Sequence, residues 1–168
     1  MNFPEPEPGA LLDSFRDAMA AIAAPVSIVT TALDGRPVGA TVSAFASLSL
    51  CPPMVVVALD DRGSLVSVIQ ASGRFGLNIL SAEQAEAAQA FARRSGVDRF
   101  EQVDWAWDHD LPRLDGVAGW VPCEVDRAID GGDHTLLLGR VLAAESVPAA
   151  PLNYHRRMFG TVTPLSSD

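Results

Sequence analysis

The sequence of 168 residues contains no lysine, so arginine accounts for all 12 residues of its Lys+Arg count. Without lysine there is no Schiff-base lysine for pyridoxal chemistry and no GxxxxGK phosphate-binding loop. Any bound phosphate must therefore be held by backbone N–H groups, hydroxyls or arginine. Asp and Glu number 21, and the net charge of −9 leaves no sign of the basic face that nucleic-acid binding needs.

Cysteine and histidine are also scarce. Cys51 and Cys123 are too few and too distant for a disulfide framework or a Cys-rich metal site. We expect both to be buried as small hydrophobic residues. The histidines, His109, His134 and His155, have no metal-ligand spacing such as HExxH, so no metal is expected.

Long apolar runs are missing as well. None reaches the ~18 residues that a membrane span needs, and the N-terminus, MNFPEPEPGA, is too acidic and proline-rich for a signal peptide. The 48% hydrophobic content suits one globular core. We expect a disordered lead-in over residues 1–10, one domain over residues 11–163 and a tail over residues 164–168, in the cytoplasm.

Three helices are expected. Apolar residues at helical spacing predict a helix from Leu12 to Ile22, which Pro25 ends. Residues 64–72 are typical of a second, short helix. A capping box, Ser81 with Gln84, predicts a third that runs to about Arg93.

Strands dominate the remainder. They are predicted over residues 26–33, 36–45, 52–60, 74–80, 120–129 and 134–146, with a short final strand in 151–165. Asp34-Gly35 is a hairpin-turn signal. The unbroken apolar run of 52–60 predicts burial on both faces, and residues 95–119 are interpreted as a loop. Short turns between most strands favour antiparallel pairing in a mainly-β barrel with few helices.

Two stretches have residues suited to anion binding. GATVSAFASLSL (39–50) places hydroxyls among small residues, so that a ligand can approach the backbone. A polar strand edge followed by a loop explains the same composition. Ser64 follows a glycine at a predicted helix start, which is typical of an anion site and equally of an ordinary N-cap.

Two further stretches carry titratable rings. In DGGDHTLLLGRV, His134 begins a strand, which places it at a barrel rim. The sequence gives no reason to expect a hydrogen bond between Asp133 and His134, because adjacent strand residues point to opposite faces. PLNYHRR clusters Tyr154, Arg156 and Arg157 in a C-terminal loop, where a ring can stack and a phosphate can pair with arginine. A satisfied polar histidine and a solvated charged loop are the alternatives.

The order of these stretches is specific. TVSAF, SLSLCPPMVVVAL, NIL, GDHTLLLGRV and PLNYHRR follow one another along the chain. From about Leu12 to Phe159 the chain resembles the short-chain flavin reductases, the reductase components of two-component flavin-dependent monooxygenases. The resemblance implies an FMN-binding split β-barrel of the antiparallel Greek-key kind. It also implies a homodimer that binds FMN or FAD near the subunit interface and takes hydride from NADH or NADPH. Reduced flavin would then diffuse to a partner monooxygenase.

The resemblance also implies roles for individual residues. The flavin would be bound by Gly39, Ala40, Thr41, Val42, Ser43, Ala44, Ser47, Leu48, Ser49, Ser64 and Asn78. The nicotinamide nucleotide would be bound by Phe15, Arg16, His134, Tyr154 and Arg157, with His134 also assigned to catalysis. Ser43 stands where many relatives have Asn, and Leu65 where they have Thr, which leaves the choice between FMN and FAD open.

Two other functions remain open. A flavin-binding electron carrier or sensor would use the same barrel without reductase turnover, since fold does not fix function. A pyridoxamine-phosphate-oxidase-like enzyme would need a basic cluster for its substrate phosphate, and the missing lysines count against it. Within the reductase hypothesis, hydride transfer belongs to the cofactors, and the protein contributes position and electrostatics.

Overall fold

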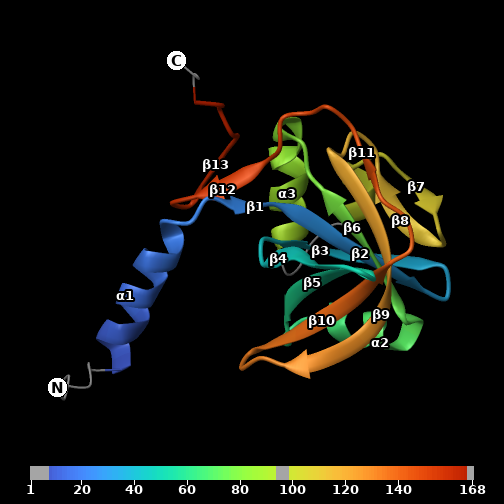
Figure 1. Ribbon diagram of the computed structural model, residues 1–168, viewed down its shortest axis with the longest axis horizontal. Coiled ribbons are helices and arrows are strands. Elements are labelled where there is room, and N and C mark those ends of the chain that lie inside the picture. Colours follow the sequence, from blue (N-terminus) through green and yellow to red (C-terminus); the bar gives the residue numbers. More distant parts are fainter. Residues whose placement is uncertain (1–7, 94–98, 166–168) are drawn as a thin grey trace.

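The largest sheet of the computed structural model has eight strands (Figure 1). The model describes residues 8–93 and 99–165, and within them every strand pairing is antiparallel. The strand order is β3-β2-β6-β9-β10-β5-β4, with β11 on β9. The bounds are β2 Ser27–Leu33, β3 Arg36–Val42, β4 Phe45–Leu50, β5 Pro53–Asp60, β6 Arg74–Ile79, β9 Gly119–Asp130, β10 His134–Val141 and β11 Glu145–Ser146. The predicted mainly-β split barrel is confirmed.

The two end strands of this order, β3 and β4, follow each other directly in the chain. Only residues 43–44 separate them, so the chain leaves one end of the sheet and joins the other end at once. The Ala58 amide donates to the Ala44 carbonyl at 2.8 Å, which ties this link to β5. The barrel is therefore closed by chain continuity at the point where its ladder is split.

Three short hairpins have two-residue turns with positive φ at both positions. Asp34 and Gly35, with φ of 51° and 74°, join β2 to β3 as predicted. The strands β7 (Trp105–Asp108) and β8 (Leu111–Leu114) form a hairpin where the sequence indicated only a loop, so that interpretation was wrong. The third joins β12 (Asn153–His155) to β13 (Met158–Gly160), and β12 also pairs with β1 (Ala24–Pro25).

Two hydrophobic clusters share the central strands. In β2, Val29 belongs to the cluster inside the barrel. Its neighbour Ile28 belongs to the cluster on the other face of the sheet, with residues of α3 (Ala85–Ala92) and of the β7–β8 hairpin. Helix α2 (Leu65–Ser72) closes the first cluster, and α3 covers the second. The predicted burial of 52–60 on both faces was wrong, because along β5 fully buried residues alternate with partly exposed ones.

The helices begin and end near the predicted positions. The Ser81 capping box is present, and a 3-10 turn, η1 (Ala82–Gln84), precedes α3. A second 3-10 turn, η2, spans Arg99–Gln102. Helix α1 spans Pro8–Ala20, so residues 8–10 of the expected lead-in are helical, while residues 1–7 lie outside the described part.

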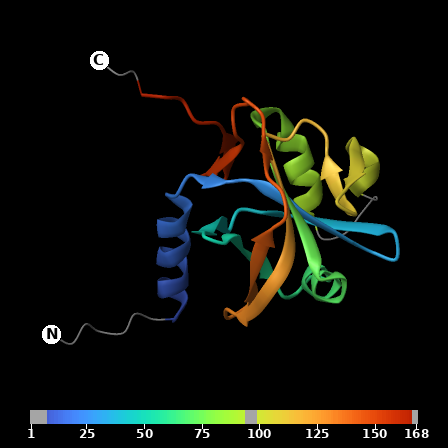
Figure 2. The same cartoon turned by 45° about the vertical axis from the view of Figure 1, so that its right-hand side comes forward.

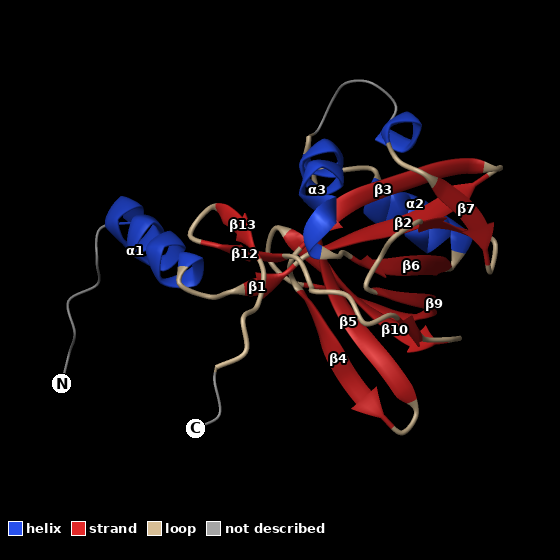
Figure 3. Cartoon of the chain, turned by 90° about the horizontal axis from the view of Figure 1, so that it is seen from above, coloured by secondary structure: helices blue, strands red, loops and turns tan. Residues whose placement is uncertain are grey.

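Helix α1 stands beside the barrel (Figures 1 and 2). Seen from above, the β12–β13 hairpin lies between α1 and the main sheet (Figure 3), and the Arg156 amide donates to the Ala20 carbonyl at 3.0 Å. In the described residues, no helix has the length and apolar character needed to cross a bilayer.

The two cysteines differ from one another. Cys123 is fully buried in the barrel, and burial raises the pKa of its thiol to about 12. Cys51 is exposed at the turn between β4 and β5, so its expected burial was wrong.

Candidate functional site

A pocket of about 540 Å³ lies where the barrel is split. One part of its wall is residues 38–44, which belong to β3 and the link after it. The other parts are the end of β5 (58–60), residues 62–65 at the start of α2, the end of α3 with Arg93, and the single residues Arg99 and His134. This volume is in the range typical of small-molecule and cofactor sites. Chain segments that are far apart in the sequence therefore meet at one concave site.

The wall formed by β3 is built from small residues because α3 packs closely behind it. A Cβ on Gly39 would lie 3.1 Å from both Phe91 Cε1 and the Val29 carbonyl oxygen. Thr41 Oγ1 donates to the Ala88 carbonyl at 2.7 Å, so its proton is already used inside the protein. The small residues leave the backbone of this wall accessible to a ligand.

Eight of the residues that the sequence assigns to cofactors line this pocket. They are Gly39, Ala40, Thr41, Val42, Ser43, Ala44, Ser64 and His134. Ser64 stands at the N-terminus of α2 and makes no capping hydrogen bond with its side chain. The stretches that contain residues 39–44, Ser64 and His134 were predicted to act together, and the fold brings them together in one pocket.

Several predicted residues lie elsewhere in this chain. Ser47, Leu48 and Ser49 continue along β4 beyond the pocket, and Ser49 Oγ accepts from the Cys51 amide at 3.2 Å. Phe15 and Arg16 are exposed on α1.

Two more of the residues assigned to the nicotinamide nucleotide, Tyr154 and Arg157, are in the C-terminal hairpin. Tyr154 packs on Phe159, with 5.1 Å between ring centroids, and Arg157 is in the turn that follows. Of the residues assigned to the nicotinamide nucleotide, His134 alone lines the pocket of its own chain.

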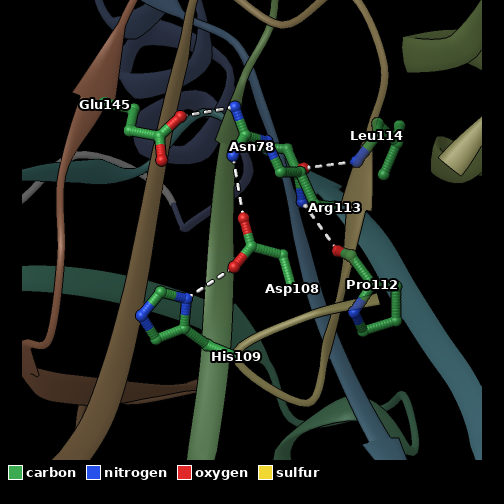
Figure 4. A network of polar contacts seen from close by, with 7 residues as sticks. All are labelled: Asn78, Asp108, His109, Pro112, Arg113, Leu114 and Glu145. Atoms are coloured by element: carbon green, nitrogen blue, oxygen red, sulfur yellow. Dashed lines mark hydrogen bonds and ion pairs between the residues drawn. The ribbon is translucent and has the colours of Figure 1, made fainter. Parts of the chain in front are cut away.

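Asn78 is a core residue in this structure. It is fully buried, and its Nδ2 donates to the Ile28 carbonyl and to Thr30 Oγ1, at 3.1 Å each. Its Oδ1 accepts from the Leu114 amide at 2.8 Å (Figure 4). These bonds fasten the β7–β8 hairpin to the barrel, and Asn78 is not among the residues that line the pocket.

Three arginines in the pocket wall were missed by the sequence analysis. Arg62 makes a bidentate ion pair with Asp60, at 2.6 and 2.8 Å, and this hydrogen bonding raises the pKa of the guanidinium. Arg99 Nη1 donates to the Gly39 carbonyl at 2.9 Å, and Arg99 also bonds to the Arg93 carbonyl. In a chain without lysine, the arginine of RGS was a signal for Arg62, whereas the sequence carries no signal that places Arg93 and Arg99 beside GATVSAF.

His134 is held by its neighbour. Its Nδ1 lies 2.7 Å from Asp133 Oδ1. Strand alternation gave no reason to expect this contact, but Asp133 precedes β10 and belongs to the turn, where alternation does not apply. The hydrogen bond from His134 holds the pKa of Asp133 below its usual range.

Comparison with known proteins gives the context of this site. Residues 19–163 match the family model described as "Flavin reductase like domain". The reductase component of the flavin-dependent trigonelline monooxygenase of Acinetobacter baylyi is 37% identical over 91% of this chain and 50% of its own length. The chain thus spans about half the length of that relative.

Two further relatives are covered more completely. The reductase component of the 4-nitrophenol 4-monooxygenase/4-nitrocatechol 2-monooxygenase of Rhodococcus opacus is 37% identical over 89% of this chain and 80% of its own length. The NADH:FAD oxidoreductase SgcE6 of Streptomyces globisporus, solved in complex with NAD and FAD fragments, superposes with a TM-score of 0.88. It has 28% identity and covers 99% of this chain and 100% of its own. On sequence and on structure, the chain belongs to the flavin reductase-like domain family.

Proposed function

We propose that this chain is an NAD(P)H:flavin oxidoreductase that reduces FMN or FAD and supplies the diffusible reduced flavin to a separate flavin-dependent monooxygenase. The carrying observation is the pocket at the split, where small residues 39–44, Ser64 and His134 meet. The relatives named as reductase components of monooxygenases support the activity and the partner. The structure solved with NAD and FAD fragments supports the choice of cofactors.

The residues present fit a flavin. The wall at residues 39–44 leaves backbone accessible from the pocket, because Gly39, Ala40 and Ala44 have little or no side chain. Backbone N–H groups there stabilise negative charge on a ring held against them. Flavin and nicotinamide supply the hydride chemistry themselves when they are bound.

The phosphate end is assigned to the opposite wall. Ser64 offers a hydroxyl at the start of α2, and the Arg62 guanidinium lies two residues before it. Arg93 and Arg99 add positive charge from the α3 side. The Arg62 fork already pairs with Asp60, and Arg99 already donates to two carbonyls. These arginines therefore offer a phosphate their positive charge and their remaining N–H groups, in place of the lysines that the chain lacks.

His134 is assigned to the nicotinamide side of the pocket. Its role is to orient the second ring, and positioning of two rings at reaction distance is the main protein contribution. His134→Ala is expected to raise the KM for NADH more than it lowers kcat. His109→Ala removes a histidine that does not line the pocket and is the matched control; steady-state kinetics with a larger loss in kcat than in KM would contradict the role.

The functional unit is proposed to be a homodimer. Helix α1 and the turn that follows it expose an apolar stripe, Leu12, Phe15, Met19 and Ile22, each about half exposed. An isolated helix of this length is marginal in water, so tertiary or quaternary packing must stabilise it. A second copy of the chain covers that stripe, and it gives the predicted residues on α1 and β12 a pocket to contact.

The decisive test is NADH or NADPH consumption, followed by absorbance, with added FMN, FAD or riboflavin under air. Saturable consumption that depends on added flavin is the expected result, and the ranking of the flavins identifies the preferred one. A protein that binds flavin tightly and consumes neither NADH nor NADPH would instead be an electron carrier or sensor. Transfer to a monooxygenase is then tested by product formation with the two proteins together.

A further inference from the structure

The contact between Asp133 and His134 determines which ring nitrogen of the histidine carries a proton. Asp133 Oδ1 lies 2.7 Å from His134 Nδ1. The low pKa of Asp133 keeps its carboxylate ionised at neutral pH, and an ionised carboxylate can only accept a hydrogen bond. Nδ1 must therefore be the donor, and in the neutral ring Nε2 then has a free lone pair.

The backbone on both sides fixes this contact. The Asp133 carbonyl accepts from the Asp61 amide at 3.2 Å, and the His134 carbonyl accepts from the Gly131 amide at 2.8 Å. Thr135, the next residue, donates through Oγ1 to Asp61 Oδ1 at 2.6 Å. The turn before β10 is thus bound to the end of β5, which holds the backbones of Asp133 and His134 in place, while the Asp133 side chain is largely exposed.

We propose that Asp133 is a positioning residue that makes His134 Nε2 an acceptor for the carboxamide N–H of the nicotinamide. The inference rests on the proposed function, since it assumes that the reduced nicotinamide enters this pocket. Nδ1 is already occupied, so Nε2 is the nitrogen left to meet a ligand at the pocket wall. A site built to accept from an amide N–H disfavours an analogue that lacks that donor.

The chain contains a second Asp–His pair outside the pocket, in which the other oxygen of Asp108 also accepts from Arg113 Nη1 at 2.8 Å. His109 Nδ1 lies 2.6 Å from Asp108 Oδ1, in the same sequence order, on the β7–β8 hairpin (Figure 4). Neither residue lines the pocket. Asp108→Asn is therefore a control that alters an equivalent histidine without altering the proposed site.

The first measurement is the tautomer itself, read by nitrogen NMR of protein labelled at its three histidines. Histidine-to-alanine variants assign the signals. We expect the proton of neutral His134 on Nδ1 in the unaltered chain and on Nε2 in Asp133→Asn, because the Asn amide can donate to Nδ1. Asp108→Asn should change the signals of His109 and leave those of His134 unchanged.

The second measurement is steady-state kinetics with NADH and with its carboxylate analogue, reduced nicotinic acid adenine dinucleotide. Loss of one hydrogen bond predicts that Asp133→Asn raises the KM for NADH up to about tenfold while kcat changes little. The preference for NADH over the carboxylate analogue should narrow by a similar factor. Asp133→Glu keeps an acceptor-only carboxylate and should recover part of the affinity, whereas Asp108→Asn should leave both substrates unaffected.

The outcomes separate this inference from the proposed function. A neutral His134 with its proton on Nε2 in the unaltered chain overturns the inference even when NADH turnover is intact. An unchanged KM for NADH in Asp133→Asn, or an equal change in Asp108→Asn, also overturns it. If the unaltered chain does not consume NADH at all, the proposed function fails and the carboxamide role fails with it, while the tautomer measurement still reports whether Asp133 controls His134.

Discussion

Helices α1 and α3 share an amphipathic pattern but have opposite environments. Both are short and have apolar residues along one face. In α3 that face is covered: Ala88 and Phe91 are almost completely buried against β3 and the aromatic residues that follow. In α1 the equivalent residues, Phe15 and Met19 among them, are about half exposed. Helical periodicity tells which side chains share a face, and it does not tell which chain covers that face.

This difference in burial predicts that α3 stabilises the fold of a single chain, whereas α1 stabilises the association of two chains. Phe91 lies 5.0 Å from Phe100, ring centroid to centroid, edge to face, and it closes the space behind Gly39. Changes in α3 should therefore appear in the free energy of unfolding of a single chain. Changes in the apolar stripe of α1 should appear in the association of two chains.

The largest expected effect is that of Phe91→Ala. Removing a buried aromatic ring is expected to cost about 3 to 5 kcal/mol of unfolding free energy, and it also removes part of the pocket wall. Urea denaturation at unchanged slope measures the loss. Gln89→Ala, on the exposed face of the same helix, should stay within about 0.5 kcal/mol; an equal loss there would show that α3 is not specifically packed through Phe91.

Phe15→Asp is expected to act on association. A charge in the middle of the α1 stripe cannot be buried without a partner, so we expect dimer affinity to fall by about 2 to 4 kcal/mol, as for an interface hot spot. Sedimentation over a range of concentrations measures the change. Asp17→Ser, also on the exposed helix α1, is the control. An unaltered chain that is monomeric at every concentration would contradict the assignment of α1 to a dimer.

Gly39→Ala and Gly9→Ala make the same change in the two environments. At Gly39 the new methyl group meets a buried ring and a backbone oxygen, both at 3.1 Å, and overpacking of this kind costs about 1 to 3 kcal/mol. At Gly9, in α1, nothing lies within 4 Å, so higher helix propensity should stabilise the helix by up to about 1 kcal/mol. The midpoint temperature of thermal unfolding should fall in Gly39→Ala and rise in Gly9→Ala. Shifts in the same direction would contradict the difference in environment between the two glycines.

The smallest expected effect is that of Thr41→Val. It keeps the shape of the side chain and removes the donor to the Ala88 carbonyl, which should cost about 0.5 to 1.5 kcal/mol. Thr161→Val removes an exposed bond to the Pro151 carbonyl and should cost less than about 0.5 kcal/mol. Equal losses in chemical denaturation would mean that the bond between β3 and α3 is no stronger than a surface contact.

Turn chemistry explains which parts of the fold were predictable. The Asp34-Gly35 turn was identified because glycine tolerates positive φ, and a DG pair is typical of such a turn. The β7–β8 turn uses His109 and Asp110, with φ of 53° and 60°, and the β12–β13 turn uses Arg156 and Arg157, with φ of 48° and 65°. A turn without glycine is a much weaker signal than a DG pair, even though His and Asp adopt positive φ more often than most residues, so the β7–β8 hairpin was interpreted as a loop.

The candidate site was predictable where it follows the chain and not where it depends on folding. The run from Gly39 to Ala44 lines the pocket as one continuous segment. Asn78 was assigned to the flavin by the family resemblance, yet its side-chain amide bonds to Thr30 and to the Leu114 amide in the core. Arg62, Arg93 and Arg99 come from separate segments, and the tertiary fold alone brings them to one pocket.

The link of Ser43 and Ala44 has a consequence for how such a pocket can evolve. The same two residues line the pocket and join the first and last strands of the barrel, so an insertion or a bulky substitution there alters ligand contacts and barrel closure together. Arg62 and Arg93 lie outside the strands and can be exchanged without changing strand register. Substitutions that change ligand preference among descendants of this chain should therefore accumulate at the arginines, while Ser43 and Ala44 should be substituted less often.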